Sequence, residues 1–377
     1  MKVQVGRALE TPSLHARLAR LVDLTRRFDA DNVAGAGEAL AERVSSTDTN
    51  DLRLILGAWS DLDPRAAFES VMDWPLESKR VVGAGVVAYE WSLRGGALEV
   101  REFVRSIPAY ATRSAAARGL VQGWALSKDL DGLTDFVANE EQIGVREQLT
   151  EILVNSLLAS GGVEPVMEWA DSIPPDVENG YKHTAFKKAL RQVANRDPEA
   201  GARWYARHSS EPYAVRSIPV IAGEWAEHDP PSALAWLLQQ PEGRERDVAL
   251  SRWITRFTVT DYRAALDWME KADLRGPLAV LPARFVGALL PDHPAEAERW
   301  SERIDDPVLR SQALREVERA RRMLGPSATR PPPADSNGGR GGAGAPMSGG
   351  AEAVDAGEAT GSGAASTSGA VSEERAS

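Results

Sequence analysis

The chain has 377 residues, of which 43% are hydrophobic, and it contains no cysteine. A chain of this length can bury a large core, and the lack of cysteine excludes disulfides, thiolate-bound metal and a cysteine nucleophile. The formal net charge of −11 argues against nucleic acid as a partner, because that affinity comes mainly from lysine and arginine contacts to phosphates. No apolar stretch is typical of a signal peptide or a membrane-spanning helix, so we expect no membrane contact and a cytoplasmic location.

The first expected helix covers residues 12–28. Its leucines and Val22 recur at helical spacing with charged residues between them, which is typical of an amphipathic helix. We interpret this helix as a cap on one end of a helical array. From residue 52 to about residue 324, apolar residues keep a helical period between prolines, and the alternating pattern of β-strands is scarce.

A unit of two helices repeats along the chain, and residues 221–241 show it most clearly. There, Asp229 is expected to be the N-cap of a helix, Pro230 its first residue and Pro241 its end. Equivalent starts lie 32 residues apart, each with a tryptophan seven residues later. These pairs are Asp197 and Trp204, Asp229 and Trp236, Asp261 and Trp268, and His293 and Trp300.

The repeat continues toward the amino terminus with small changes. Asp63 and Gly95 are again 32 residues apart, and Gly162 precedes Asp197 by 35 residues. Small residues, such as Gly123 before Trp124, are expected to let neighbouring helices approach closely. The sequence therefore predicts an all-α fold, a right-handed α-solenoid of about nine stacked helix pairs over residues 1–324.

This repeat of Trp, three residues, Asp-Pro and then Ala-Leu-x-Trp-Leu resembles the α-solenoid class that includes tetratricopeptide and HEAT repeats. The resemblance covers most of residues 20–324, but the pattern departs from the tetratricopeptide signature, which has Leu-Gly and Tyr after the Trp. The resemblance implies the architecture and a surface that binds another protein or peptide.

No residue pattern points to catalysis, a cofactor or a metal, so we expect none of these. The repeated tryptophans are interpreted as core residues, and the repeated aspartates as helix caps. None of the five histidines forms a pair at metal-ligand spacing, and the Gly95-Gly96 and Gly161-Gly162 pairs are interpreted as turn glycines.

One basic segment, residues 180–196, departs from the acidic background. Its candidate partner-binding residues are His183, Lys187, Lys188 and Arg191, of which His183, Lys187 and Arg191 share one helix face. A solvated helix face is one interpretation of this segment. The other is a docking patch for an acidic partner.

Residues 325–377 lack aromatic side chains and are rich in Gly, Ala, Ser and Pro. Such a segment cannot form a core, and we predict that it is a disordered tail, either a tether or a segment without a role. For the whole chain we expect a non-enzymatic scaffold or adaptor that binds an unidentified protein or peptide. The alternatives are an enzyme or regulatory domain with a site assembled from scattered residues, and a structural array without a groove.

Overall fold

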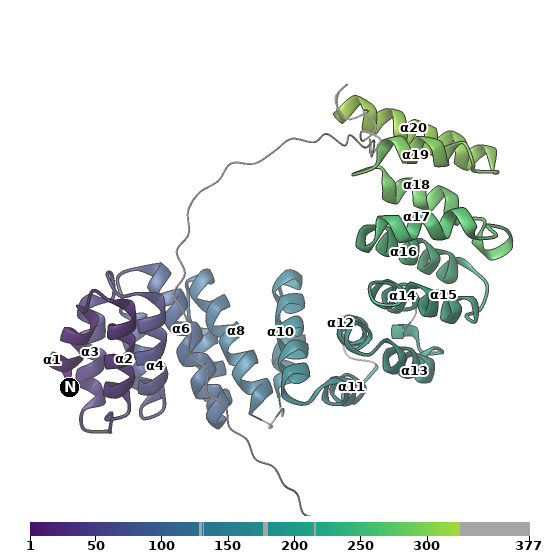
Figure 1. Ribbon diagram of the computed structural model, residues 1–377. Coiled ribbons are helices and arrows are strands. Elements are labelled where there is room, and N and C mark those ends of the chain that lie inside the picture. Colours follow the sequence, from purple (N-terminus) through teal and green to yellow (C-terminus); the bar gives the residue numbers. More distant parts are fainter. Residues whose placement is uncertain (128–129, 131, 176–179, 215, 325–377) are drawn as a thin grey trace, which may run out of the picture. The chain divides into compact units, whose positions relative to one another are not determined.

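A computed structural model describes residues 1–324 except 128–129, 131, 176–179 and 215. The described residues form α-helices and short turns of other helix types, with no strand among them, which confirms the all-α prediction (Figure 1). They belong to one compact unit, Met1–Arg330. The tail predicted for residues 325–377 lies outside the described residues.

The helices of the amino-terminal half are α1 (Lys2–Leu9), α2 (Leu14–Thr25), α3 (Val33–Arg43), α4 (Thr49–Ser60), α5 (Pro64–Met72), α6 (Glu77–Trp91), α7 (Ala97–Ser106), α8 (Tyr110–Leu126), α9 (Leu133–Ala138) and α10 (Ile143–Gly161). Those of the carboxy-terminal half are α11 (Val163–Ser172), α12 (Tyr181–Arg196), α13 (Pro198–His208), α14 (Ile218–Ala226), α15 (Pro230–Leu238), α16 (Arg244–Thr260), α17 (Tyr262–Lys271), α18 (Leu281–Leu289), α19 (Pro294–Ser301) and α20 (Pro307–Leu324).

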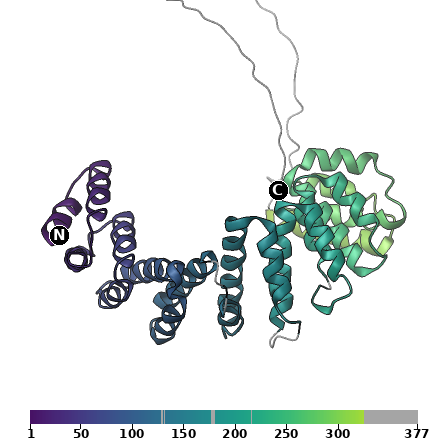
Figure 2. The same ribbon diagram turned by 90° about the horizontal axis from the view of Figure 1, so that it is seen from below.

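Most helices pack on their neighbours in the chain. The even-numbered helices from α2 to α20 contact one another in order, and from α4 to α18 each of them also contacts the odd-numbered helix that follows it. Figures 1 and 2 show α6, α8 and α10 side by side. The helix expected over residues 12–28 is α2, and α1, which the sequence analysis does not predict, buries Val5 beside it. Packing stabilises α1, since an isolated helix of eight residues is too short to persist in water.

The aspartates predicted as helix caps have that role. The carboxylates of Asp63, Asp197, Asp229 and Asp261 each accept a hydrogen bond from the backbone amide three residues later, at 2.8 to 3.1 Å. The hydrogen bonds of Asp229 to Ser232 hold the pKa of its carboxyl below the ordinary value. His293 makes no such cap, and its ring stacks on Tyr262 instead, with 3.7 Å between the ring centroids.

Of the four repeated tryptophans, two lie in the core as predicted, and two lie at its edge. Trp204 is fully buried and Trp300 is 1% exposed, whereas Trp236 and Trp268 are only partly buried at the edge of the core. Gly123 confirms the predicted close approach of helices: a Cβ atom there would lie 2.2 Å from the carbonyl oxygen of Tyr89, so α8 packs directly on the backbone of α6. Gly162 adopts a φ of 80° at its turn, which favours glycine.

A basic side chain repeats at the start of the even-numbered helices, and the sequence analysis does not predict it. Its guanidinium donates to a backbone carbonyl six residues earlier, near the end of the preceding helix. The six pairs are Arg17 with Thr11, Arg80 with Trp74, Arg113 with Ile107, Arg146 with Glu140, Arg246 with Gln240, and Arg310 with Ile304. In α12 the equivalent bond runs from Lys182 Nζ to the carbonyl of Ala170, at 2.5 Å. These charge-assisted bonds hold the start of each of these helices against the end of the helix that precedes it.

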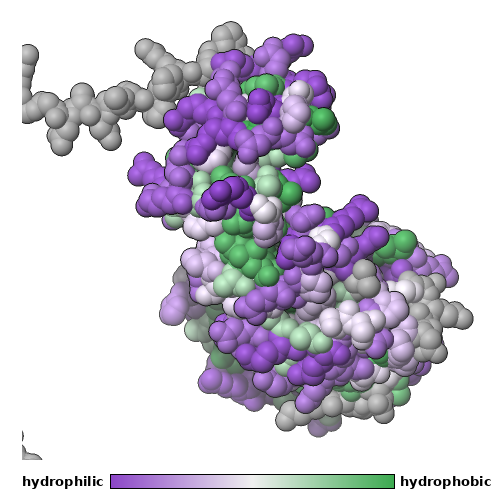
Figure 3. Space-filling view, turned by 90° about the vertical axis from the view of Figure 1, so that its right-hand side faces the viewer, coloured by the Kyte–Doolittle hydropathy of each residue, from purple (hydrophilic) through white to green (hydrophobic). Residues whose placement is uncertain are grey.

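One face of the protein is mainly hydrophilic. Figure 3 shows one face on which hydrophilic residues predominate and hydrophobic residues gather in an area between them. In the part of the chain that the structure describes, no helix combines the length and the apolar character needed to cross a membrane.

Candidate functional site

A basic hollow lies where α12, α14 and α16 meet, and we call it the cationic groove. It has a volume of about 330 Å³. Packing of α12 on α14 and of α14 on α16 brings together three segments that are distant in the sequence. The lining residues are Lys187, Arg191, Arg216, Pro219, Val220, Arg244, Glu245, Val248 and Arg252.

Five of these lining residues are cationic and one is acidic. All five cationic side chains are exposed to solvent. Arg191 pairs with the buried Glu224 of α14 at 3.7 Å, and no ion pair is found for the other four within the described residues. Pro219, Val220 and Val248 add apolar surface between the charges. The groove therefore combines an excess of positive charge with a small hydrophobic floor.

Glycine at position 223 makes room for one of these cations. A Cβ atom at Gly223 of α14 would lie 2.9 Å from Cγ and Nε of Arg252, so the long side chain of Arg252 crosses α14 at this residue. The side chain of Arg252 thereby covers α14 and also lines the groove. Any larger residue at position 223 would displace Arg252.

The segment that carries Arg216 into the groove is held by α12 and α13. The carbonyl oxygen of Tyr213 lies 2.9 Å from Nδ1 of His183, and its hydroxyl lies 2.8 Å from Nδ1 of His208. The Nζ atom of Lys182 lies 4.8 Å from the centroid of the Tyr213 ring. Arg216 follows with a φ of 68°, the one positive φ outside glycine among the described residues. Such a conformation costs free energy and persists where the surroundings fix it.

The structure places the four predicted partner-binding residues in different surroundings. Lys187 and Arg191 line the groove. His183 lies one turn before Lys187 on the same exposed face, but its ring contacts the backbone of Tyr213, so it positions the connection to Arg216. Lys188 is half-buried and pairs with Glu151 of α10 at 3.3 Å. The groove thus contains two of the four candidates.

Three groove residues were not predicted from the sequence: Arg216, Arg244 and Arg252. They lie 29 to 65 residues after Lys187, in segments whose sequence indicates only ordinary repeat units. Their spacing does hold a clue, because Lys187 and Arg252 lie 65 residues apart, close to two repeats of 32. Aligning the even-numbered helices by the repeat would have placed both side chains on equivalent turns.

A chain of polar contacts lies beside the groove. His208 Nε2 lies 3.1 Å from Oδ1 of Asp171, and both Asp171 carboxylate oxygens accept from Nε1 of Trp204, at 3.0 and 3.3 Å. Burial is the main cause that raises the pKa of the Tyr213 hydroxyl, with Glu211 and Asp171 adding to it. Burial also lowers the pKa of Lys182. Asp171, His208 and Tyr213 together tie α11, α13 and the following connection into one network.

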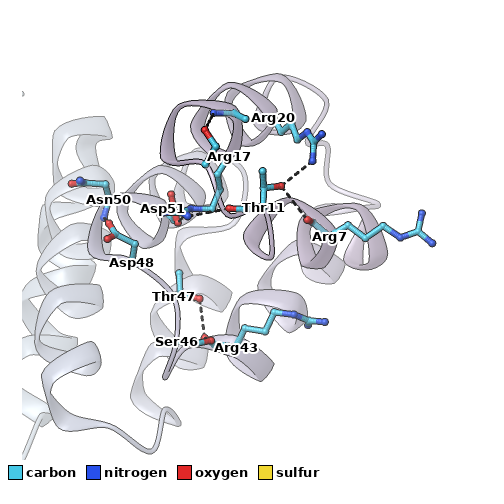
Figure 4. A network of polar contacts seen from close by, with 12 residues as sticks. Arg7, Thr11, Arg17, Arg20, Arg43, Ser46, Thr47, Asp48, Asn50 and Asp51 are labelled. Carbon is cyan, nitrogen blue, oxygen red and sulfur yellow. Dashed lines mark hydrogen bonds and ion pairs between the residues drawn. The ribbon is translucent and has the colours of Figure 1, made fainter.

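A second polar hollow, of about 410 Å³, lies in the amino-terminal helices (Figure 4). We call it the N-terminal hollow, and its lining residues are Leu9, Glu10, Arg17, Arg43, Ser46, Thr47, Asp48 and Asp51. Here the arginines are paired: Arg17 Nε lies 2.6 Å from Oδ2 of Asp51, and Arg43 Nη2 lies 3.2 Å from Oε1 of Glu10. The arginines of the N-terminal hollow are therefore neutralised within the protein, unlike most cations of the cationic groove.

The described residues contain no group of three or more histidine, aspartate or glutamate side chains placed to hold a metal ion. A comparison with protein-family models gives no match, and a comparison with curated proteins gives no significant match.

Proposed function

We propose that the chain is a right-handed α-solenoid of about nine helix pairs that acts as a non-enzymatic scaffold or adaptor, and that it binds an acidic segment of a partner protein in the cationic groove. The observation that carries this proposal is the presence in one hollow of four exposed cations for which the described residues supply no ion-pair partner, in a chain whose net charge is −11. An acidic chain gains nothing for its solubility from such a local excess of positive charge.

The composition of the groove indicates the partner's chemistry. Arginine guanidinium groups bind carboxylates with paired hydrogen bonds, and arginines make up three of the four groove cations that have no ion-pair partner among the described residues. Pro219, Val220 and Val248 would accept a small apolar side chain between the acidic residues. A peptide with several carboxylates and an aliphatic residue fits both features.

The test measures binding of a fluorescein-labelled peptide of eight glutamates by fluorescence anisotropy. We expect the parent chain to bind this peptide at low salt and to release most of it at about 0.5 M NaCl, where exposed charges are screened. Lys187→Glu combined with Arg252→Glu should weaken binding about tenfold or more, because each reversal replaces attraction with repulsion.

Two controls separate the groove from net charge. Lys271→Glu with Arg275→Glu makes the same change in net charge at exposed residues outside the groove, and Lys188→Gln removes a charge from α12 that already pairs with Glu151. Both variants should bind as the parent does. Equal binding by the groove variant and the parent, or no binding by the parent at low salt, would overturn the proposal.

The alternative is an enzyme or regulatory domain with a site assembled from scattered residues. The network of Asp171, His208 and Tyr213 is the observation that favours it, since an aspartate–histidine pair can move a proton to or from a hydroxyl. The network also has a sufficient structural role, because it fixes the connection that carries Arg216. His208→Gln distinguishes the two: under the binding proposal it weakens the oligoglutamate complex only by loosening Arg216, and Arg216→Gln should then reproduce the loss.

A further inference from the structure

The charge of the cationic groove suits a compact ligand with more than one negative charge. Its five cations come from α12, from the connection before α14 and from α16, and Glu245 is its one acidic lining residue. The lining therefore has a formal charge of +4. Glu245 is half-buried and forms no ion pair with these cations in the part of the chain that the structure describes. Most of the positive charge is left for a ligand.

Two helix starts add to the positive potential of the groove, since its lining includes residues from the first turns of α14 and α16. Neither helix has a side-chain cap. Ser217, the N-cap of α14, has a buried hydroxyl without a hydrogen-bond partner among the described residues, and the N-cap of α16 is Gly243. An aspartate caps α13, α15 and α17 instead. The free amides at an uncapped helix start attract anions.

The backbone of Arg216 indicates that its side chain has a role at the groove. Its φ of 68° lies in the left-handed region, which favours glycine, and its side chain is exposed. Contacts of Tyr213 with His183 and His208 hold this connection in place. Residues in such conformations concentrate at ligand sites, where the surroundings fix them. The chain thus holds an arginine in a costly conformation at the edge of a groove that attracts anions.

We infer that the cationic groove binds a phosphorylated side chain of the partner segment, with the phosphate against the groove arginines. The inference rests on the proposed function, because it names the group that anchors the partner in the same groove. A phosphorylated serine, threonine or tyrosine carries a charge of about −1.5 to −2 and three acceptor oxygens on one group. Guanidinium groups bind phosphate with paired, charge-assisted hydrogen bonds, and arginine clusters recognise phosphorylated segments in this way.

Glutamate side chains supply this charge less compactly. Along an extended segment every second side chain points to the same face, and these side chains are about 7 Å apart. A hollow of about 330 Å³ therefore admits one or two carboxylates, each with a single charge. A phosphate places a similar charge on one group, where several guanidiniums can share it. The hydrophobic floor of Pro219, Val220 and Val248 then remains free for a neighbouring side chain of the partner.

The experiment compares three fluorescein-labelled peptides on the full chain by fluorescence anisotropy. The first has one phosphoserine and a valine among alanines. The second has glutamate at the phosphoserine position and at an adjacent alanine, which matches the charge, and the third has serine. The phosphopeptide should bind about tenfold or more tightly than the charge-matched peptide, because phosphate accepts additional charge-assisted hydrogen bonds. The serine peptide should bind least.

The inference and the proposed function fail in different ways. Equal affinities of the phosphopeptide and the charge-matched peptide would overturn the inference, and the proposed function would stand if oligoglutamate still binds. Binding of the phosphopeptide without binding of oligoglutamate would support the inference and overturn the carboxylate as the ligand.

Variants of Arg216 test whether the phosphate lies in the groove. Arg216→Gln and Arg216→Gly should each weaken phosphopeptide binding about fivefold or more. Arg275→Gln removes an exposed charge outside the groove and should bind as the parent does. Arg216→Gly also relaxes the backbone, so its thermal midpoint should equal or exceed that of the parent. Binding lost without loss of stability assigns Arg216 to the ligand. Parent-like binding by both Arg216 variants would overturn the inference.

Two further probes separate a phosphorylated protein from other sources of phosphate. Inorganic phosphate should compete only at concentrations well above the dissociation constant of the phosphopeptide, because it makes no contact with the hydrophobic floor. Phosphatidylcholine vesicles that contain phosphatidic acid should not sediment the chain. Sedimentation with these vesicles, or competition by inorganic phosphate at the dissociation constant of the phosphopeptide, would overturn the assignment to a partner protein.

Discussion

The N-terminal hollow and the cationic groove are built from the same kinds of residue and differ in how the charges are paired. In the N-terminal hollow, Arg17 and Arg43 have carboxylate partners, and Asp51 is almost fully buried beside Arg17. In the cationic groove, only Arg191 has a partner within the described residues. The difference separates two uses of arginine: charges paired inside the chain stabilise the fold, and charges left unpaired are available to another molecule.

The largest expected effect on stability is at the buried ion pair between Arg17 and Asp51 in the N-terminal hollow. Asp51→Ala should lower the free energy of unfolding by about 3 to 5 kcal/mol, because it leaves the Arg17 guanidinium largely buried without a counter-charge. Urea unfolding followed by circular dichroism measures the change.

Two variants show whether charge pairing is the cause. Asp48→Ala removes a neighbouring acidic cap of α4 and should cost only about 1 kcal/mol. Asp51→Leu combined with Arg17→Met removes both charges and should recover much of the loss, since apolar residues can replace a buried ion pair. A cost for Asp51→Ala no greater than that for Asp48→Ala would contradict the assignment of a stabilising role to this pair.

The next largest expected effect on stability is at the contact between α10 and α12. This contact joins the part of the chain that contains the N-terminal hollow to the part that contains the cationic groove. The hydroxyl of Tyr181 is buried and lies 3.3 Å from Oγ1 of Thr150, and burial raises the pKa of Tyr181 to about 12. The unfolded chain releases this proton near pH 10 and the folded chain does so near pH 12, so the neutral hydroxyl stabilises the fold below pH 10. This stability should fall by about 1.4 kcal/mol per pH unit between pH 10 and pH 12.

Tyr181→Phe tests this expectation, because phenylalanine does not titrate. Near pH 7 the variant should be about 1 kcal/mol less stable than the parent through the lost hydrogen bond. Above pH 10 the difference should shrink and then reverse. Parallel stability curves of the two chains from pH 9 to pH 11.5 would contradict the assignment of a raised pKa to Tyr181.

Features of the repeat could be predicted from the sequence where a residue type has a single role that involves only its neighbours in the chain. Asp63, Asp197, Asp229 and Asp261 cap helices as predicted, because an N-cap bond involves atoms only three residues apart. The repeated arginines were missed, although Arg80, Arg113 and Arg146 lie 33 residues apart, since a basic residue at a helix start has no single interpretation in sequence.

The groove could be predicted only in part, because it depends on packing between helices. A helical wheel correctly places Lys187 and Arg191 on one exposed face of α12. It cannot show that Lys188, one position further round, meets Glu151 of α10, or that Arg252 crosses α14 at Gly223. These contacts join residues 29 to 37 positions apart, and only the packing of neighbouring helices decides them.

The smallest expected effect on stability is a gain. It gives the most direct test of the difference between the cationic groove and the N-terminal hollow. Arg252→Gln should raise the free energy of unfolding by a few tenths of a kcal/mol at low salt, because it removes one of several like charges that repel one another across the groove. The gain should vanish at about 1 M NaCl, where screening acts over roughly 3 Å. Glutamine keeps part of the side chain that covers Gly223, so lost packing should contribute little. Paired urea titrations of parent and variant at both salt concentrations measure the difference. If Arg252→Gln destabilises the chain by 1 kcal/mol or more, Arg252 supports the fold as Arg17 does, and the distinction between the groove and the N-terminal hollow is lost.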